Sequence, residues 1–132
     1  MARLIDWQSR LTDYLIATAR TPFRPGQQDC ALWVAGAVAE MTGENPAPNA
    51  DYSTIKAGLN VLKSLGFDDH VAFVAAHFEA VHPAFAQPGD IAVVAGDLDQ
   101  SLGIVLGETV AVLKSSGWGH VPASTATQVF RV

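Results

Sequence analysis

The sequence predicts a single α+β domain, helical over residues 1–80 and built of strands over residues 81–132. Its 132 residues, of which 49% are hydrophobic and 16% are charged, match one domain of ordinary size with a real core. Before Pro83, apolar residues recur at three- and four-residue steps, which is typical of helices. After Pro83, short apolar runs alternate with turn residues, which is typical of an antiparallel meander.

The first predicted helix is amphipathic and ends near Arg20, because the prolines within residues 22–26 forbid a helix there. Its recurring positions are Leu4, Trp7, Gln8, Leu11, Tyr14, Leu15 and Thr18. The second predicted helix, residues 30–41, is apolar on nearly every face, which indicates a helix buried on all sides at the centre of the fold. Asp29 is a good N-cap for it, and Gly43 is a good C-terminal stop.

Two further helices and five strands complete the predicted domain. The third helix ends at Gly66 and carries Ile55, Leu59, Leu62 and Leu65. Asp68 can cap the fourth helix, whose inner side carries Val71, Val74, Ala75 and Phe78. The strands are expected over residues 91–94, 102–106, 109–113, 119–122 and 128–132. A glycine at the first of two loop residues predicts a type II′ hairpin turn at Gly107-Glu108.

Charge and cysteine content exclude several classes of partner. The net charge is −5, from 13 acidic and 8 basic residues without a basic stripe, so no nucleic-acid partner is expected. No uncharged stretch is long enough to span a bilayer, so no membrane partner is expected. Asp6 stands where a signal peptide needs its apolar core. The single cysteine excludes an internal disulfide, and a reducing compartment is the simplest expectation.

Cys30 is the first candidate catalytic residue. Its predicted place directly after the helix cap gives it unpaired backbone amides and the positive end of the helix dipole, which stabilise a thiolate and lower its pKa. Two interpretations remain open, a nucleophile or a buried packing residue, since free cysteine is among the most buried residue types. The carboxylate of Asp29 opposes a thiolate unless capping turns it toward the helix amides.

Three motifs along the chain carry a family resemblance. They are Phe23-x-x-Gly26-x-x-Asp29-Cys30-Ala31-x-Trp33, then Pro88-Gly89-Asp90-Ile91-Ala92-Val93-Val94, then Leu102-Gly103-Ile104-Val105-Leu106-Gly107. In this order they resemble the NlpC-type cell-wall cysteine peptidases. The resemblance implies a papain-like fold, with a central buried helix that begins at the cysteine and packs on a C-terminal antiparallel sheet. The whole chain is then one NlpC-like domain, with Cys30 at the position of the nucleophile.

In more detail, the chain is similar to an uncharacterised family encoded in phage and prophage tail gene clusters. The further shared features are Tyr52-Ser53-Thr54 after the second helix and the terminal Phe130-Arg131-Val132. This resemblance implies other phage tail proteins as partners. It also implies a location in the host cytoplasm before assembly and in the virion tail afterwards. A retained peptidase activity implies a peptidoglycan stem peptide as the partner instead.

The peptidase pattern places a histidine directly before its apolar-Gly-apolar strand, and this chain has Ser101 there. A serine hydroxyl cannot accept a proton at neutral pH as an imidazole can. The helix dipole alone contributes ~0.3–1 kcal/mol, less than one pKa unit, so the thiol of Cys30 is expected to stay mostly protonated. His120, on a late loop or strand, is the alternative imidazole partner. A surface or turn role is the competing interpretation of His120.

The candidate substrate-binding residues are Asp29, Trp33 and Trp118. Trp33 lies on the predicted central helix and is most simply a core residue. The glycines on both sides of Trp118 predict a poorly covered indole that lines a groove or a protein interface, with core packing as the alternative.

No cofactor and no metal are expected. His70 and His77 are two helical turns apart, which separates their ring nitrogens too far for one ion, and with His82 they are expected to be solvated. Asp97, Asp99 and Gln100 form an incomplete calcium-binding pattern and are expected in a solvated hairpin turn. The glycine-rich stretches lack the spacing and the lysine of a phosphate-binding loop.

Three functions are compatible with these observations. The first is a phage or prophage tail protein that keeps a papain-like frame, has lost turnover and acts in tail assembly or structure. The second is an active cell-wall peptide hydrolase or amidase with Cys30 as nucleophile. The third is a binding module with an apolar groove between helix and sheet.

Overall fold

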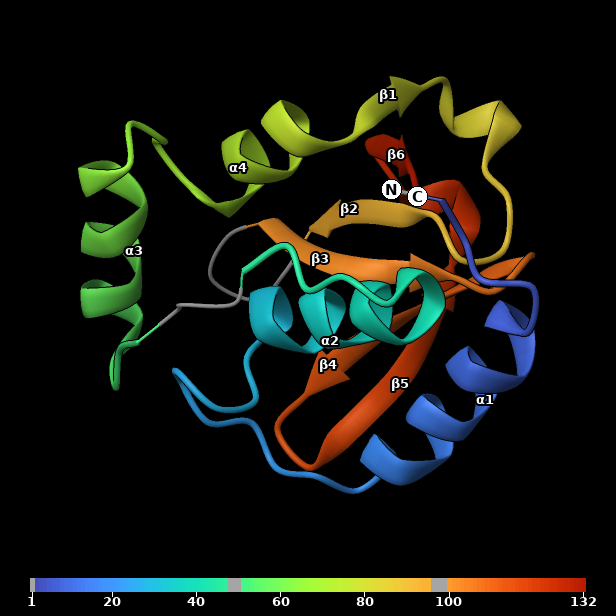
Figure 1. Ribbon diagram of the computed structural model, residues 1–132, viewed down its shortest axis with the longest axis horizontal. Helices are drawn as coiled ribbons and strands as arrows, with labels where there is room; N and C mark the ends of the chain where they lie inside the picture. Colours follow the sequence, from blue (N-terminus) through green and yellow to red (C-terminus); the bar gives the residue numbers. More distant parts are fainter. Residues whose placement is uncertain (1, 48–50, 96–99) are drawn as a thin grey trace.

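The computed structural model describes residues 2–47, 51–95 and 100–132, which form an α+β domain (Figure 1). Four helices come first in these ranges, followed by six strands with two short 3-10 turns between them. The helices are α1 (Trp7–Thr18), α2 (Cys30–Thr42), α3 (Ile55–Ser64) and α4 (His70–His77). The strands and turns are β1 (Glu79–Val81), η1 (Pro83–Phe85), β2 (Ile91–Ala95), β3 (Gln100–Val105), β4 (Thr109–Lys114), β5 (Gly117–Pro122), η2 (Ala123–Thr125) and β6 (Gln128–Arg131).

The six strands form one sheet in the order β1-β6-β2-β3-β4-β5, and each neighbouring pair is antiparallel. The predicted meander from β2 to β5 is confirmed, with strand ends that differ by one or two residues. Strand β1 was not predicted: residues 79–81 leave α4 and pair with the last strand. The β3–β4 turn has two residues as expected, and its Gly107 has a φ of 127° that favours glycine.

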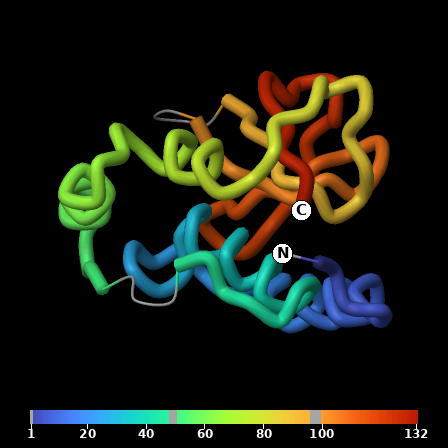
Figure 2. Tube along the Cα trace, turned by 45° about the horizontal axis from the view of Figure 1, so that its top comes forward, coloured from blue at the N-terminus to red at the C-terminus, as the bar shows by residue number. Residues whose placement is uncertain are grey.

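Helix α2 is the central element, as its apolar sequence predicted. One side packs on the sheet and the other on α1, so Figure 2 shows α1 and α2 as a layer beneath the strands. Trp33, Ala37, Val38 and Met41 are 0% exposed. The helix is well terminated at both ends. The Asp29 side chain accepts from the Leu32 amide at 2.9 Å, and Gly43 ends the helix with a left-handed φ of 80°.

The sheet is buried on both faces. The inward side chains of the central strands, Ile91, Val93, Leu102, Ile104, Ala111 and Phe130, pack with α1, α2 and α4. The opposite face carries Ala92, Val94, Val105, Val110, Val112 and Val129, which pack with residues of β1, β5 and the turns. This is why β2 reads as a continuous apolar run rather than an alternating one.

The predictions for α3 and α4 need three corrections. Helix α3 stands at one end of the molecule, away from the sheet (Figure 1), so Ile55 is 57% exposed and Leu65 is 62% exposed. Asp69 caps α4, accepting from the Ala72 amide at 2.8 Å, where Asp68 was expected. Ala75 is exposed rather than inward. An amphipathic pattern predicts a helix but does not say how much of its apolar side finds a neighbour.

Residues near both ends of the chain contact Asp90, which lies in the turn that leads into β2. Asp90 is 0% exposed and accepts from the Arg3 and Arg131 guanidinium groups, each at 3.1 Å. Its carboxylate also accepts from the Gln87 amide at 2.9 Å and the Val132 amide at 3.3 Å. This ion-pair cluster therefore joins the first residues, the β2 turn and the last strand.

Two further expectations concern a membrane and the acidic loop. None of the helices in the described ranges has the length and apolar character needed to cross a bilayer. Of the predicted acidic hairpin turn, residues 97–99 lie outside the described residues, whereas Gln100 begins β3 rather than lying in a loop.

Candidate active site

Cys30 is the first residue of α2 and packs against the start of β3. The backbone N–H groups of Leu102, Ala31 and Cys30 itself lie near its sulfur and lower the thiol pKa. The Leu102 amide can reach the thiol because the pairing of β3 with β4 begins only at Gly103. The predicted position of the cysteine, at the beginning of a buried helix beside the sheet, is confirmed.

The environment of the thiol favours its neutral form. Burial raises the pKa of the Cys30 thiol, and the nearby Asp29 carboxylate raises it further. The three backbone amides lower the pKa but do not outweigh burial. The helix N-terminus was expected to lower the pKa slightly. The opposite shift results, because desolvation of a charged sulfur is the larger effect at this site.

Asp29 is buried, at 4% exposure, and its carboxylate oxygens are already occupied. Oδ1 accepts from the Leu32 amide at 2.9 Å, and Oδ2 accepts from the Gly26 amide at 3.0 Å and from the Tyr52 hydroxyl. Capping therefore turns the carboxylate toward amides, as considered from the sequence, yet it still raises the thiol pKa. The expectation that Asp29 binds substrate is corrected, because its carboxylate oxygens already accept hydrogen bonds within the protein.

Tyr52 belongs to this site, and the sequence analysis did not select it as a site residue. Its hydroxyl donates to Asp29, and its ring lies against Gly58 of α3, where a Cβ would be 2.8 Å from the ring. Its carbonyl lies where a Cβ on Gly26 would stand, and Gly26 has a φ of 80°. Burial and the Asp29 carboxylate raise the pKa of the Tyr52 phenol. The Tyr52-Ser53-Thr54 motif was the available signal in the sequence, but it did not indicate that Tyr52 contacts Asp29.

Ser101 does not face Cys30, which corrects the expectation that it occupies the histidine position of a catalytic pair. It is paired with Val94, whose side chain packs on the sheet face opposite α2. The neighbouring Leu102 is the residue that points toward α2. Alternation along a strand therefore separates the Ser101 side chain from the thiol by the thickness of the sheet.

His120 faces the same side of the sheet as α2, and its ring contacts Thr109 and Trp118 rather than Cys30. It pairs with Ala111, which pairs with Ile104. It is thus two strands across and two residues along from Leu102, a backbone separation of about 12 Å for ordinary strand spacings. Its Nδ1 lies 3.1 Å from the Thr109 hydroxyl, and its ring meets Trp118 edge-on at 5.1 Å. The proposed Cys30–His120 pair is therefore wrong for this structure.

The other three histidines also have partners elsewhere. His70 Nε2 lies 2.8 Å from the Gln100 carbonyl, and His77 Nδ1 lies 2.8 Å from that of Phe73. His82 Nδ1 accepts from the Ala84 amide at 3.0 Å. His77 and His82 are exposed, as expected, whereas His70 is half-buried. In the described part of the chain no histidine ring is hydrogen-bonded to the Cys30 sulfur, and no three His, Cys, Asp or Glu residues are grouped to hold a metal.

Two tryptophans proposed for substrate binding serve the core. Trp33 is 0% exposed, and its indole N–H donates to the Thr18 hydroxyl at 3.0 Å, so it cannot contact a substrate. Trp118 packs against the same core and donates to the Leu15 carbonyl at 2.7 Å. Of the two interpretations of Trp118, core packing is the one that holds.

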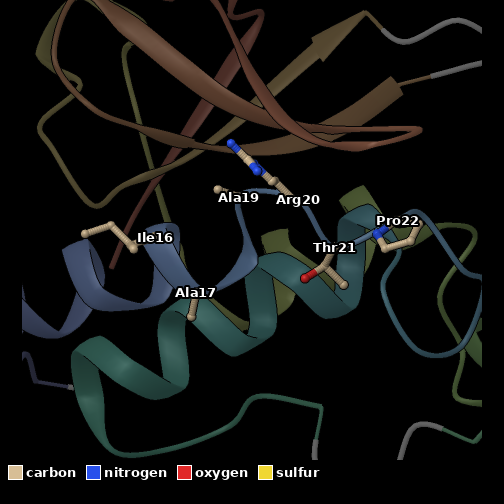
Figure 3. A pocket seen from close by; sticks show the side chains of 6 residues that line it. All are labelled: Ile16, Ala17, Ala19, Arg20, Thr21 and Pro22. Atoms are coloured by element: carbon tan, nitrogen blue, oxygen red, sulfur yellow. The ribbon is translucent and has the colours of Figure 1, made fainter.

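Two surface depressions lie on α1 rather than at the thiol. One of about 520 Å³ is lined by Ile16, Ala17, Ala19, Arg20, Thr21 and Pro22, with Arg20 pointing toward the sheet (Figure 3). Another of about 450 Å³ is lined by residues of α1 together with Asp6 and Glu40. Cys30 and its neighbours contribute to neither depression.

The comparisons with known proteins address the family alone. None of the curated proteins matches the chain. A family profile described as a domain of unknown function, DUF6950, matches residues 2–132, which is nearly the whole chain. The chain therefore belongs to the DUF6950 family, a domain of unknown function.

Proposed function

We propose that this protein is associated with phage or prophage tails, has a papain-like NlpC-type fold that has lost turnover, and acts in tail assembly or structure. The observation that supports the loss of turnover is the state of Cys30. Cys30 is half-buried, the pKa of its thiol is raised, and no histidine among the described residues is hydrogen-bonded to it.

Peptide hydrolysis by a cysteine needs a thiolate, a base that takes its proton, and an acid that returns that proton to the leaving amine. Here Ser101 faces the other side of the sheet, and the backbone of His120 is about 12 Å from that of Leu102, the strand residue beside the thiol. The Asp29 carboxylate already accepts from two amides and a phenol. The residues that surround the sulfur can bury it but cannot move its proton.

The tail role depends on the motif resemblance and is supported by apolar side chains left on the surface. Ile5, Ile16, Leu65 and Phe85 are exposed large hydrophobic residues. An exposed hydrophobic side chain is a place where another protein could add a contact. We expect the partner to be another tail protein rather than a small substrate.

The proposal is tested in a phage or prophage that carries the gene. Deleting the gene is expected to prevent assembly of infectious tails, and a copy with Cys30→Ser is expected to restore them fully. Purified wild-type protein is expected to leave peptidoglycan intact. Normal tails without the gene would contradict the tail role.

One observation favours a second candidate, an active cell-wall peptide hydrolase. The amides of Cys30, Ala31 and Leu102 converge on the sulfur, and such donors can stabilise an oxyanion at a carbonyl under attack. This function predicts hydrolysis of wall peptides by the wild type that Cys30→Ser abolishes. It also predicts an alkylation pKa well below that of a free thiol.

A further inference from the structure

Strand β5 is one edge of the sheet, and half of its backbone groups point away from β4. The Ala123 amide donates to the Glu108 carbonyl at 2.9 Å, which fixes which residues of the two strands exchange hydrogen bonds. In an antiparallel pair such residues alternate with residues that face outward. The N–H and C=O groups of Trp118 and His120 therefore point to the open side of β5. The bonds between β3 and β4 give the same alternation.

The outward groups of Trp118 and His120 have no hydrogen-bond partner within residues 2–47, 51–95 and 100–132. His120 is exposed and Trp118 is half-buried. The end of α1 lies close to the start of the strand, since a Cβ on Gly117 would overlap the Ala19 carbonyl. Beyond Gly117 the open side of β5 is a row of unpaired donors and acceptors, to which an extended chain can add.

The opposite edge of the sheet, β1, is protected in ways that β5 is not. Strand β1 has three residues, begins with the exposed Glu79 and is followed by Pro83 in η1. Short length, charge and proline are the features that natural edge strands use to block pairing. Strand β5 has six residues, and from Gly117 to Val121 it contains no Asp, Glu, Lys, Arg or Pro. It is therefore the edge that is open to another strand.

Two cationic side chains flank this edge near the start of β5. Lys114 lies across Gly119 on the sheet face opposite α2, where a Cβ on Gly119 would be 2.9 Å from the Lys114 Cε. Arg20 lies beside Gly117 on the side of α1, and its side chain points toward the sheet (Figure 3). Neither cation forms an ion pair with a carboxylate in the part of the chain that the structure describes. The edge is thus locally positive in a protein whose net charge is −5.

We propose that the open edge of β5 binds an extended acidic segment of another protein, which adds to the sheet as a further antiparallel strand beside Trp118 and His120. Successive side chains of a strand point to opposite faces, so two adjacent acidic residues can reach Arg20 and Lys114 from one segment. A second copy of this chain fits less well. Antiparallel pairing of Trp118 with His120 of that copy brings two Lys114 side chains together over Gly119, and like charges repel. The proposal does not depend on the tail role, so either can fail without the other.

The test is an NMR titration of the full chain with two short peptides that differ only in charge. The acidic probe is acetyl-VTVTVEE-amide, whose acidic end lies beside the start of β5 in an antiparallel arrangement, and the control probe is acetyl-VTVTVKK-amide. The acidic probe is expected to shift the amide signals of Trp118 and His120 and to slow their hydrogen exchange. The control probe is expected to bind at least about tenfold more weakly, because two attractive pairs become repulsive. Raising the salt concentration from about 0.05 to 0.5 M is expected to weaken binding of the acidic probe.

Substitution of the two cations tests the charge part of the proposal. Arg20→Gln and Lys114→Gln are each expected to weaken binding of the acidic probe about two- to fivefold, the range of an exposed ion pair. Lys63→Gln is the matched control, because Lys63 is exposed on α3 at the far end of the molecule (Figure 1). It is expected to leave binding unchanged.

Substitution of His120 tests the backbone part. His120→Pro removes one outward N–H without breaking a bond to β4, so an edge strand tolerates it. It is expected to weaken the acidic probe at least about tenfold, because a donor is lost and the ring blocks the approaching chain. His120→Val keeps the N–H and is expected to bind as the wild type does. Thermal unfolding checks that both variants fold, and the glutamine variants test the proposal independently of them.

Several results would overturn the proposal. Equal affinity for the two peptides, or no binding of the acidic probe up to about 2 mM, would do so. Signal shifts confined to elements other than β5, or wild-type affinity in a folded His120→Pro variant, would do so as well. Sedimentation velocity of the chain alone tests the other occupant. Self-association that His120→Pro abolishes and Lys114→Gln tightens would show that the edge pairs with a second copy instead.

Discussion

Asp29 and Asp90 are two buried carboxylates of the same domain, and they differ in the partners that surround them. Both are almost fully buried, and both accept several hydrogen bonds. Asp90 has two arginine partners, Arg3 and Arg131. Asp29 has neutral donors, two amides and the Tyr52 phenol. The first carboxylate is neutralised by its neighbours, whereas the second keeps a negative charge beside a thiol.

The difference teaches what each carboxylate does for the protein. Around Asp90 the charge is paired and joins both ends of the chain, so its contribution is to the stability of the fold. Around Asp29 the charge has no cation, so it raises the pKa of Cys30 and holds Tyr52. Solvation lost on burial is recovered by ion pairs in one case and by polar hydrogen bonds in the other.

The largest expected effect is at Asp90. Asp90→Ala leaves two guanidinium groups and two amides without their common acceptor and is expected to lower the free energy of unfolding by about 3–5 kcal/mol. Chemical denaturation measures the change. The control is Asp6→Ala, which removes an exposed ion pair with Arg10 and is expected to cost less than about 1 kcal/mol. A similar loss of stability in both variants would show that the ion-pair cluster at Asp90 does not stabilise the fold.

Asp29→Asn tests the other carboxylate with little change of shape. The amide can still cap α2 but presents N–H groups to the Gly26 amide or the Tyr52 hydroxyl, so a loss of about 1–2 kcal/mol is expected. Removal of the charge is also expected to lower the pKa of the Cys30 thiol, because Asp29 raises it. The pH dependence of alkylation reports that shift. A higher thiol pKa in the variant would contradict the assigned role of the charge.

Arg3→Lys separates charge from geometry in the Asp90 cluster. The guanidinium of Arg3 donates to the Val132 carbonyl at 3.0 Å, to the Pro88 carbonyl at 2.9 Å and to Asp90 at 3.1 Å. An ammonium group keeps the charge but cannot span these acceptors, so we expect a loss of about 1 kcal/mol. Stability equal to that of the wild type would mean that charge alone holds the termini together.

The smallest expected effect is a pH slope from Cys30. Burial raises the thiol pKa in the folded state above the unfolded value of about 8.5, so the folded state keeps the proton longer. The contribution is complete below pH ~8.5 and is lost as pH rises above it, at no more than about 1.4 kcal/mol per pH unit. Denaturation between pH 7 and 10 is expected to show a shallower decline of stability in Cys30→Ser than in the wild type. Parallel curves would show that the thiol is not shielded.

The sequence predicted an element best where the residues that define it lie within or next to that element. Helix α2 carries its own cap, stop and apolar faces, so its limits and its central place were predicted correctly. The two-residue turn at Gly107 was predicted for the same reason. Strand β1 was missed because its three residues form a strand only by pairing with β6. Asp69 rather than Asp68 caps α4 because either residue satisfies the same pattern.

The candidate site was predictable in its position but not in its partners. The sequence placed Cys30 at a helix start, yet Ser101 and His120 were expected near it. Strand register decides both cases. Ser101 pairs with Val94, so its side chain lies on the face opposite α2, and His120 is in register with Ile104 rather than with Leu102 beside Cys30. The Tyr52 contact joins residues 23 apart through two glycines, and periodicity does not predict such a contact.

The amino-acid sequence by itself determined which segments are helices and strands, because capping, turn chemistry and apolar periodicity act over a few neighbouring residues. It also determined that one sulfur lies at the start of the most apolar helix. The tertiary structure alone decided that this thiol is half-buried with a raised pKa, and that the two ends of the chain share Asp90. The physical reason is that burial and ion pairing depend on which distant residues come together.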